Sequence, residues 1–202
     1  MKRFKGTKGL ICLAVICVLI VGYYYYLSNR EPEKAPEEDV VVSEIQNVLL
    51  RDLEYNYPPS PKEVVKYFME LTKHIYNGKG SEEEFNALAV KIQEIYDDEL
   101  VANKSQELYL QDLKSEAILF KENDYSVVNY ATSSSVDVDY FDEDGFSFAR
   151  LRGTMYIRVG TEMKSLEQVF LLRQDDAGHW KIYGWQEVEP KVENEAEEVK
   201  SE

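Results

Sequence analysis

The residues best suited to acid–base chemistry are few in this sequence. The only histidines are His74 and His179, and Asp137 and Asp139 alternate with valines in a strand-like stretch. A histidine or carboxylate buried in a cavity can be tuned to act as a general base. Here His74 falls near a predicted helix end, His179 follows a predicted turn, and the two aspartates share one strand face. We therefore interpret all four as surface or capping residues, and we predict no catalytic residue.

The acidic stretch that leads to Gly145 is a candidate calcium loop. An EF-hand loop needs oxygen ligands at positions 1, 3 and 5, a glycine at position 6 and a bidentate Glu at position 12. When Gly145 is aligned to the glycine position, Asp142 and Asp144 fall correctly, but Tyr140 and Leu151 stand at the first and last positions. The stretch is therefore predicted to be an acidic hairpin turn, and we predict neither a metal site nor a cofactor.

Aromatic residues near the end of the domain are candidates for a ligand site. On a regular strand, Trp180 and Ile182 share one face, and Tyr183 and Trp185 share the other. Core packing is the usual role of such residues. The wall of a ligand pocket is the alternative, because pockets are mostly apolar with few polar groups. The sequence has no serine-nucleophile elbow, zinc-protease motif or glycine-rich nucleotide loop.

Charge and cysteine content limit the partners. The 202 residues include 23 Lys and Arg against 38 Asp and Glu, a formal net charge of -15. Nucleic acid is excluded as a partner, because its phosphates are held by clustered Lys and Arg. The two cysteines, Cys12 and Cys17, both precede the predicted domain, so a disulfide-stapled fold and a cysteine zinc site are excluded as well.

Residues 9–27 form an uncharged apolar run that ends in the four tyrosines 23–26. At about 1.5 Å per residue, a helix of this length can cross the hydrocarbon core of a bilayer. Basic residues precede the run and acidic residues follow it, which predicts a cytoplasmic N-terminus. The tyrosines fit the interfacial aromatic belt, and no small-residue cleavage site follows them. We predict an uncleaved signal anchor that contacts the lipid bilayer.

Five segments follow from this pattern. Residues 1–8 are predicted to be a cytoplasmic basic segment, 9–27 a transmembrane anchor and 28–39 an acidic, proline-containing linker. Residues 40–188 are predicted to form an extracytoplasmic domain, and 189–202 an acidic disordered tail.

Helices are predicted in the first half of the domain, over residues 40–53, 60–77, 81–96 and 105–121, from apolar residues at helical spacing. Ser60 with Glu63 and Ser81 with Glu84 form two capping-box patterns, in which a serine caps the helix three residues before a glutamate. Gly78 ends the second helix, because glycine tolerates the left-handed conformation.

Beyond residue 123 the hydrophobic period changes to two, which predicts an antiparallel meander of about four strands. They fall within residues 125–140, 146–159, 166–173 and 179–188, with a hairpin turn at 143–145. Gly153 interrupts the alternation and predicts a bulge, which would exchange the faces of the strand. The fold class is therefore α+β.

Helices followed by a long antiparallel sheet resemble the NTF2-like (cystatin-like, SnoaL-like) architecture. The stretches YPPSP at 57–61, YDDELVAN at 96–103, and FLLR at 170–173 leading to WKIYGW at 180–185 are also similar to a family of uncharacterised membrane-anchored proteins of Gram-positive bacteria. The resemblance covers residues 55–188. It implies helices packed on a curved, cone-shaped sheet, and it brings no catalytic residues.

We therefore expect a membrane-anchored, extracytoplasmic binding or interaction domain without covalent chemistry. Two alternatives remain open. One is a SnoaL-like cavity enzyme that uses a carboxylate or a histidine as general acid and base. The other is a structural accessory of a cell-envelope assembly, with a protein partner or a homodimer formed through the sheet. An ionisable group in an open cavity would favour the enzyme, and an exposed apolar patch on the sheet would favour the accessory.

Overall fold

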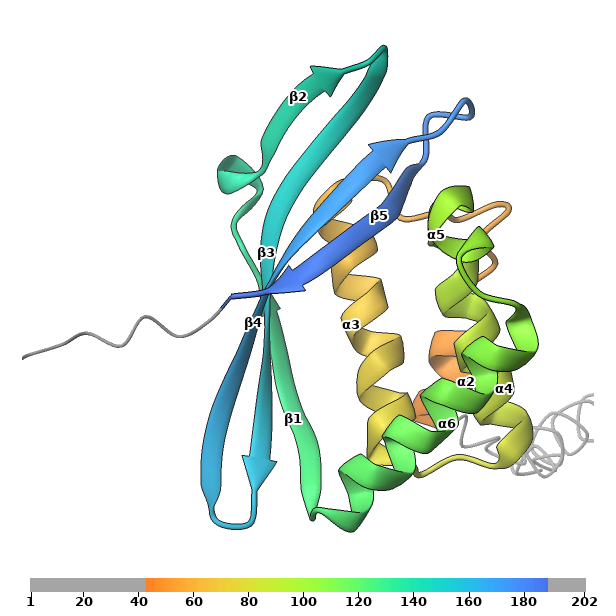
Figure 1. Cartoon of the computed structure of the whole chain (residues 1–202), viewed down its shortest axis with the longest axis vertical. Helices are drawn as coiled ribbons and strands as arrows, with labels where there is room; N and C mark the ends of the chain where they lie inside the picture. Colours follow the sequence, from red (N-terminus) through yellow and green to blue (C-terminus); the bar gives the residue numbers. More distant parts are fainter. Residues whose placement is uncertain (1–42, 189–202) are drawn as a thin grey trace, which may run out of the picture. The chain divides into compact units, whose positions relative to one another are not determined.

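Helices come first and strands second in residues 43–188, which are the residues that the structure, a computed structural model, describes (Figure 1). This order confirms the predicted α+β class. The predicted anchor, linker and tail at 9–27, 28–39 and 189–202 lie outside the described residues. Within 43–188, none of the helices has both the length and the apolar character that a membrane span requires.

Serine caps set the helix starts. The hydroxyl of Ser60 accepts a hydrogen bond from the Glu63 backbone N–H, and Ser81 and Glu84 form a complete capping box. The helices are α2 (Glu44–Leu49), α3 (Pro61–Asn77), α4 (Glu82–Glu94), α5 (Asp98–Ala102) and α6 (Gln106–Glu122). The first is shorter than the predicted 40–53, and the short α5 was not predicted.

The sheet has five antiparallel strands, where about four were predicted. The strands are β1 (Tyr125–Thr132), β2 (Asp139–Glu143), β3 (Phe146–Val159), β4 (Glu162–Gln174) and β5 (Trp180–Glu187). Their order is β1-β3-β4-β5, and β2 also pairs with β3. Thr132 lies opposite Gly153 and Asp139 opposite Arg150, so β1 and β2 follow one another along the same edge of β3. The single turn of 3-10 helix at Ser135–Asp137 separates them.

The bulge predicted at Gly153 is wrong. Gly153 pairs in regular register with Gln168, and the irregularities lie elsewhere. One falls between Val127 and Asn129 in β1, and the other is in β5, opposite Leu171 and Leu172. The predicted hairpin turn is confirmed, with Asp144 at φ 51° and Gly145 at φ 85°.

The bulge in β5 changes which side chains share a face. Leu172 lies opposite Ile182 and Phe170 lies opposite Trp185, so Ile182 and Trp185 both face the helices. The prediction that Trp185 shares a face with Tyr183 is therefore wrong. The extra residue in a bulge shifts the alternation of inward and outward side chains by one position. Nothing in the sequence of β5 marks where this residue is inserted.

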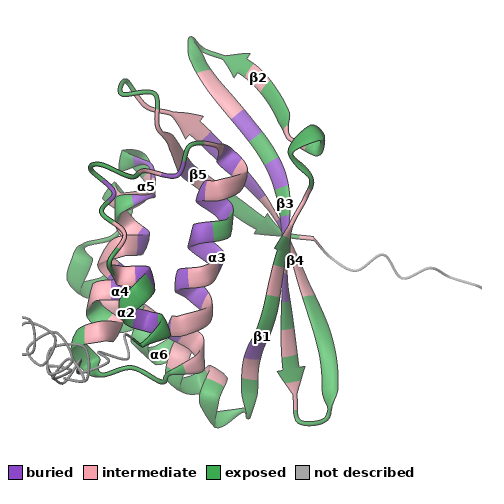
Figure 2. Cartoon of the chain, turned by 180° about the vertical axis from the view of Figure 1, so that it is seen from behind, coloured by how far each residue is buried: buried purple, intermediate pink, exposed green. Residues whose placement is uncertain are grey.

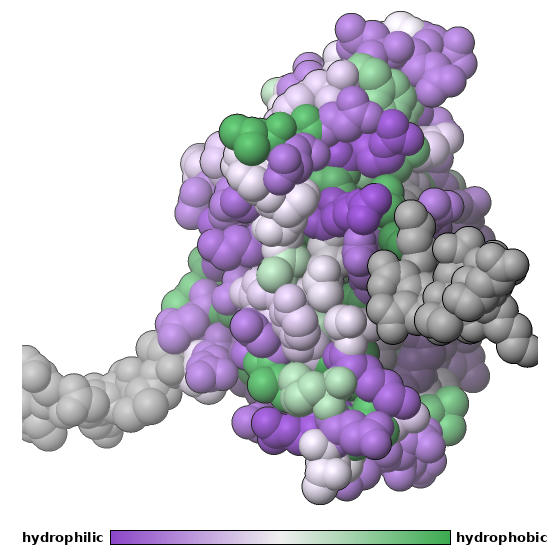
Figure 3. Space-filling view, turned by 90° about the vertical axis from the view of Figure 1, so that its left-hand side faces the viewer, coloured by the Kyte–Doolittle hydropathy of each residue, from purple (hydrophilic) through white to green (hydrophobic). Residues whose placement is uncertain are grey.

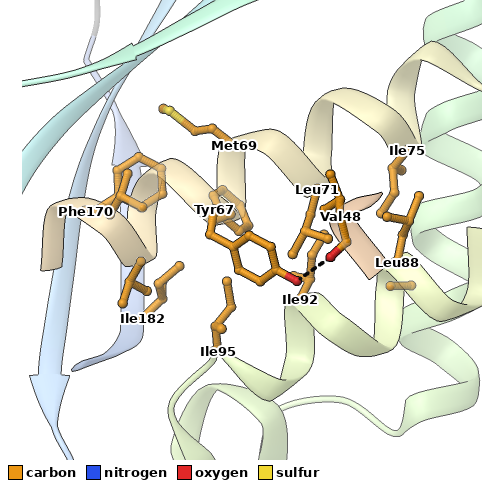
Figure 4. Packing of buried hydrophobic residues seen from close by; sticks show 14 of the residues in the cluster. Val48, Tyr67, Met69, Leu71, Ile75, Leu88, Ile92, Ile95, Phe170 and Ile182 are labelled. Carbon is orange, nitrogen blue, oxygen red and sulfur yellow. Dashed lines mark hydrogen bonds between the residues drawn. The ribbon is translucent and has the colours of Figure 1, made fainter. Parts of the chain in front are cut away.

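The core lies on both sides of α3. The helices cover one face of the sheet, and buried positions run along α3 and the facing strands (Figures 1 and 2). Figure 4 shows Met69 of α3 with Phe170 of β4 on the sheet side of α3, and Leu88 and Ile92 of α4 on its other side. The Tyr67 hydroxyl donates a hydrogen bond of 3.1 Å to the Val48 carbonyl oxygen. Helix α3 thus packs between the sheet on one side and α4 on the other. Buried side chains, Met69 and Phe170 among them, fill the space between α3 and the sheet.

Candidate functional site

The segment that joins α4 to α5 extends the sheet. The backbone N–H of Ile182 donates to the Ile95 carbonyl oxygen, and that of Asp97 donates to the Ile182 carbonyl oxygen, each at 2.9 Å. Tyr96 thereby forms a parallel bridge with Ile182 of β5. This pairing places the Tyr96 ring beside Trp185, with ring centroids 5.7 Å apart.

Arg173, which is partly buried, holds this segment in place. The Arg173 guanidinium donates to both carboxylate oxygens of Asp97, at 2.6 and 2.9 Å, and to Glu99 at 2.7 Å. The Asp97 carboxylate also accepts from the Glu99 backbone N–H and so caps α5. Because these groups are bound to one another, we assign this cluster a structural role.

Beside this segment lies a cavity of about 320 Å³, between α3, α4, α6 and β5. Five aromatic residues line it: Phe68, Tyr76, Tyr96, Tyr109 and Trp185. Trp185 lies 5.5 Å from Phe68 between ring centroids, and Tyr96 lies 6.4 Å from Tyr109. Four of the rings, those of Phe68, Tyr96, Tyr109 and Trp185, therefore form one continuous wall. Trp185 keeps 40% of its surface exposed.

The cavity is apolar inside and polar around its mouth. Ile75, Ile92 and the nearly buried Thr72 line its interior. Exposed polar side chains line the mouth: Asn103, Lys104, Asp112 and Glu116. A small number of polar groups around an apolar space is the usual composition of a small-molecule site.

The tyrosine hydroxyls of the cavity are neutral at ordinary pH. Burial, and then the neighbouring Glu116 carboxylate, raises the pKa of Tyr76. Burial also raises the pKa of Tyr109, and burial followed by the nearby Tyr109 hydroxyl raises that of Tyr96. These groups can therefore donate and accept hydrogen bonds, and they do not supply a phenolate base.

Two carboxylates at the mouth differ in their partners. Lys104 forms an ion pair with Asp112. Glu116 accepts a hydrogen bond of 3.0 Å from the Tyr76 hydroxyl, and it makes no ion pair within residues 43–188. Lys104 also lies near enough to Glu116 for that carboxylate to help raise the pKa of the lysine. The three charged side chains at the mouth therefore carry a formal net charge of -1.

Of the three aromatic residues predicted as a pocket or packing wall, Trp185 lines the cavity. Trp180 instead packs on Tyr140, with ring centroids 5.7 Å apart. Tyr183 is the extra residue of the β5 bulge, and its hydroxyl donates to Glu99 at 3.1 Å. The bulge separates Tyr183 from Trp185, whereas Trp180 lies at the start of β5, five residues from Trp185.

The acid–base candidates lie away from the cavity. His179 stacks on Tyr57 at 4.3 Å between ring centroids, and Asp139 pairs with Arg150 at 2.6 Å. His74 is half-buried in the last turn of α3, where burial lowers its pKa. The described residues contain no cluster of His, Cys, Asp or Glu that could hold a metal ion.

The outer face of the sheet, turned away from the helices, is mostly hydrophilic, with hydrophobic residues in small separate groups (Figure 3). It has a broader depression lined in part by Phe141, Arg150 and Leu171, and Trp185 borders this depression as well as the cavity. The ion pair between Arg150 and Asp139 interrupts its apolar lining. We therefore regard the cavity on the helix side as the stronger candidate site.

Four of the five aromatic residues of the cavity were not predicted as site residues: Phe68, Tyr76, Tyr96 and Tyr109. A signal was available on α3, because Phe68, Thr72 and Tyr76 recur every four residues and so share one helix face. Tyr109 and Glu116 are seven residues apart, which is two turns of α6. The sequence does not show that these faces of α3 and α6 pack against one another.

The chain belongs to the family described as Domain of unknown function (DUF6715), whose sequence profile matches residues 1–185. The match includes the basic segment and the apolar run at 9–27 as well as the folded domain. No curated protein matches the chain.

Proposed function

We propose that this protein is a single-pass membrane protein whose extracytoplasmic domain captures a small ligand without covalent chemistry. The observation that carries the proposal is the cavity lined by five aromatic residues between α3, α4, α6 and β5. Its volume of about 320 Å³ lies at the lower end of the range for small-molecule sites. A ligand with an apolar body and a few hydrogen-bonding groups would match its lining.

The proposed location rests on the sequence pattern. The uncharged run at 9–27 follows Lys2, Arg3, Lys5 and Lys8, and the acidic residues all come later. The match to the family profile covers residues 1–185 and therefore includes this run. The short linker at residues 28–39 would then hold the domain close to the outer surface of the membrane.

We also propose an NTF2-like relationship for the domain. It is supported by the order of helices before an antiparallel sheet and by the covering of one sheet face by helices. The open space differs from a central cone, because Met69 and Phe170 fill the region between α3 and the sheet. In this proposal the cavity lies nearer to α6 and the edge strand β5 than a central cone would.

The two tryptophans allow a direct test of ligand capture. Trp185 lines the cavity and Trp180 does not, so the full chain labelled with 5-fluorotryptophan in a nonionic detergent should give one fluorine resonance at the site and one internal control. Titration with the water-soluble neutral probes benzyl alcohol and 3,3-dimethylbutan-1-ol should shift the Trp185 resonance in a saturable way. It should leave the Trp180 resonance in place.

A matched pair of variants on α6 controls for nonspecific effects. Leu113→Phe adds volume inside the cavity and should abolish the shift, whereas Leu108→Phe makes the same kind of change at a side chain that is 52% exposed outside it. Equal shifts in both variants, or no saturable shift in the unmodified chain, would refute ligand capture in this cavity.

A further inference from the structure

The aromatic wall has an electrostatic preference as well as an apolar one. The face of each ring carries partial negative charge, so a cation placed over it is attracted. Tyr96 is adjacent to both Trp185 and Tyr109, with centroids 5.7 and 6.4 Å apart. Several rings can therefore contact one compact ligand group at the same time.

The charges around the cavity mouth also favour a cation. The lining contains one cation, Lys104, and two anions, Asp112 and Glu116, a formal sum of -1. Lys104 is neutralised by its ion pair with Asp112. Glu116 accepts a hydrogen bond from Tyr76 and interacts with Lys104 at longer range, but it forms no ion pair among the described residues.

An anionic ligand fits this site poorly. The lysine that could pair with an anion is engaged by Asp112, and Glu116 would repel the anion from the same rim. The tyrosine hydroxyls can donate to an anion, but neutral donors do not compensate a nearby carboxylate. The net charge of -15 on the chain adds a weak long-range field that also favours cations.

We infer that the ligand of this cavity is an organic cation, namely an alkylated or quaternary ammonium group, held among the aromatic rings with Glu116 at the mouth. This inference rests on the proposed function and specifies its ligand class. The apolar substituents of the cation would contact the ring wall and Ile75 and Ile92. Its charge would face Glu116, whose carboxylate the Tyr76 hydroxyl orients at 3.0 Å.

A pair of isosteric probes separates charge from shape. Choline and 3,3-dimethylbutan-1-ol have nearly the same size and differ in the replacement of the cationic nitrogen by carbon. With the full chain labelled by 5-fluorotryptophan, we expect both to shift Trp185, and choline to bind about tenfold more tightly. A tenfold ratio corresponds to about 1.4 kcal/mol, within the range of a cation contact with desolvated aromatic rings.

Glu116→Gln tests the role of the carboxylate. It keeps the size and the acceptor oxygen for Tyr76, so the affinity for the neutral alcohol should stay within about twofold. The preference for choline should fall to about threefold, the part that the rings supply. Glu122→Gln, an exposed carboxylate on the same helix outside the cavity, is the matched control and should keep the full preference.

The aromatic contribution is tested at Tyr109. Tyr109→Leu removes a ring while it keeps most of the apolar volume, and it should weaken choline binding about threefold more than alcohol binding. Tyr109→Phe should restore the preference, because the ring returns without the hydroxyl. An unshifted Trp180 resonance in each variant reports that the fold is intact.

The outcomes distinguish this inference from the proposed function. If both probes shift Trp185 with equal affinity, the cavity binds ligands but the cation inference is wrong. A choline preference that survives unchanged in Glu116→Gln and Tyr109→Leu also overturns it, because neither group would then recognise the charge. If neither probe shifts Trp185, ligand capture itself is refuted.

Discussion

At Gly153, the side chain of Met69 from α3 occupies the space that a Cβ atom on β3 would need. A Cβ atom at this position would lie 2.1 Å from Met69 Cε and 3.0 Å from Phe170 Cε2. Met69 and Phe170 are both fully buried, so neither has open space to move into. The glycine that looked like a bulge signal is therefore a packing requirement of the core.

We expect Gly153→Ala to lower the free energy of unfolding by about 1–3 kcal/mol, because one added methyl group overpacks a filled core. Adding Met69→Leu, which shortens the opposing side chain, should recover part of the loss. Gly184→Ala is the control, since a Cβ atom there meets nothing within 4 Å. Chemical denaturation of the three variants measures the effect, and equal stability of Gly153→Ala and Gly184→Ala would contradict the packing argument.

Arg173 is the residue that fixes the α4–α5 segment against β5. Its side chain is 15% exposed and that of Asp97 is 6% exposed, so this is a largely buried ion pair. We expect Arg173→Met to lower the free energy of unfolding by about 3–5 kcal/mol, because the Asp97 charge stays buried without its partner. Asp97→Asn in the same chain should recover part of this loss.

The exposed ion pair of Arg150 with Asp139 provides the comparison. Both side chains are more than half exposed, and Arg150→Met should change stability by about 0–1 kcal/mol. Thermal denaturation of the two arginine variants measures the difference directly. Similar losses at Arg150 and Arg173 would show that burial does not govern the strength of these pairs.

Glu99 makes the same cluster sensitive to acid. Hydrogen bonds from Arg173 and then from Tyr183 hold the pKa of Glu99 below its ordinary value of 4.5. Because the folded state favours the carboxylate, its stabilising contribution is complete above the ordinary pKa and is lost as the pH falls through the lowered one. We expect Glu99→Gln to be less stable than the unmodified chain at neutral pH, and the gap to close on acidification below 4.5. A gap in melting temperature that is constant across this range would contradict the linkage.

At the scale of elements, the β1 bulge depends on a side chain from α3. The Asn77 amide donates to the Val127 carbonyl oxygen and accepts from the Val127 N–H, both at 2.9 Å. It thus pairs with the backbone groups of the residue that starts the bulge, as a neighbouring strand would. The end of α3 is thereby tied to the edge of the sheet.

We expect Asn77→Ala to lower the free energy of unfolding by about 1–3 kcal/mol, because two half-buried backbone groups lose their partners. Asn86→Ala, at an exposed position in the middle of α4, should stay within about 0.5 kcal/mol of the unmodified chain. Hydrogen exchange adds a local readout, since the Val127 amide should lose protection in Asn77→Ala and keep it in Asn86→Ala.

The elements differ in how far local sequence determines them. The starts of α3, α4 and α6 were predicted, because serine caps and helical stripes are signals within one short segment. The break between β1 and β2 and the bulges were not, because they depend on which strand pairs with which residue. The cavity was missed for the same reason, since Tyr76, Tyr96 and Tyr109 come from separate elements and meet only through tertiary packing. Trp185 could be named in advance, but its face could not.

At the scale of the whole molecule, the orientation of the chain in the membrane decides which compartment the cavity meets. The proposed topology places the N-terminus inside and residues 40–188 outside, with four basic residues before the apolar run as its determinant. The acidic linker at 28–39 contributes little to orientation, because the positive-inside rule counts Lys and Arg rather than net charge. The argument therefore depends on Lys2, Arg3, Lys5 and Lys8.

We expect a fusion of alkaline phosphatase to the C-terminus to be active in a bacterial host, because this enzyme folds only outside the cytoplasm. The same fusion with green fluorescent protein should stay dark when exported in unfolded form. A charge-reversed variant should reverse both signals, because the excess of basic residues then lies after the apolar run. This variant replaces Lys2, Arg3, Lys5 and Lys8 by serine and carries Glu31→Lys and Glu33→Lys. A bright fluorescent fusion in the unmodified chain would put the cavity in the cytoplasm. It would refute the extracytoplasmic location while leaving ligand capture to be judged by the tryptophan resonances alone.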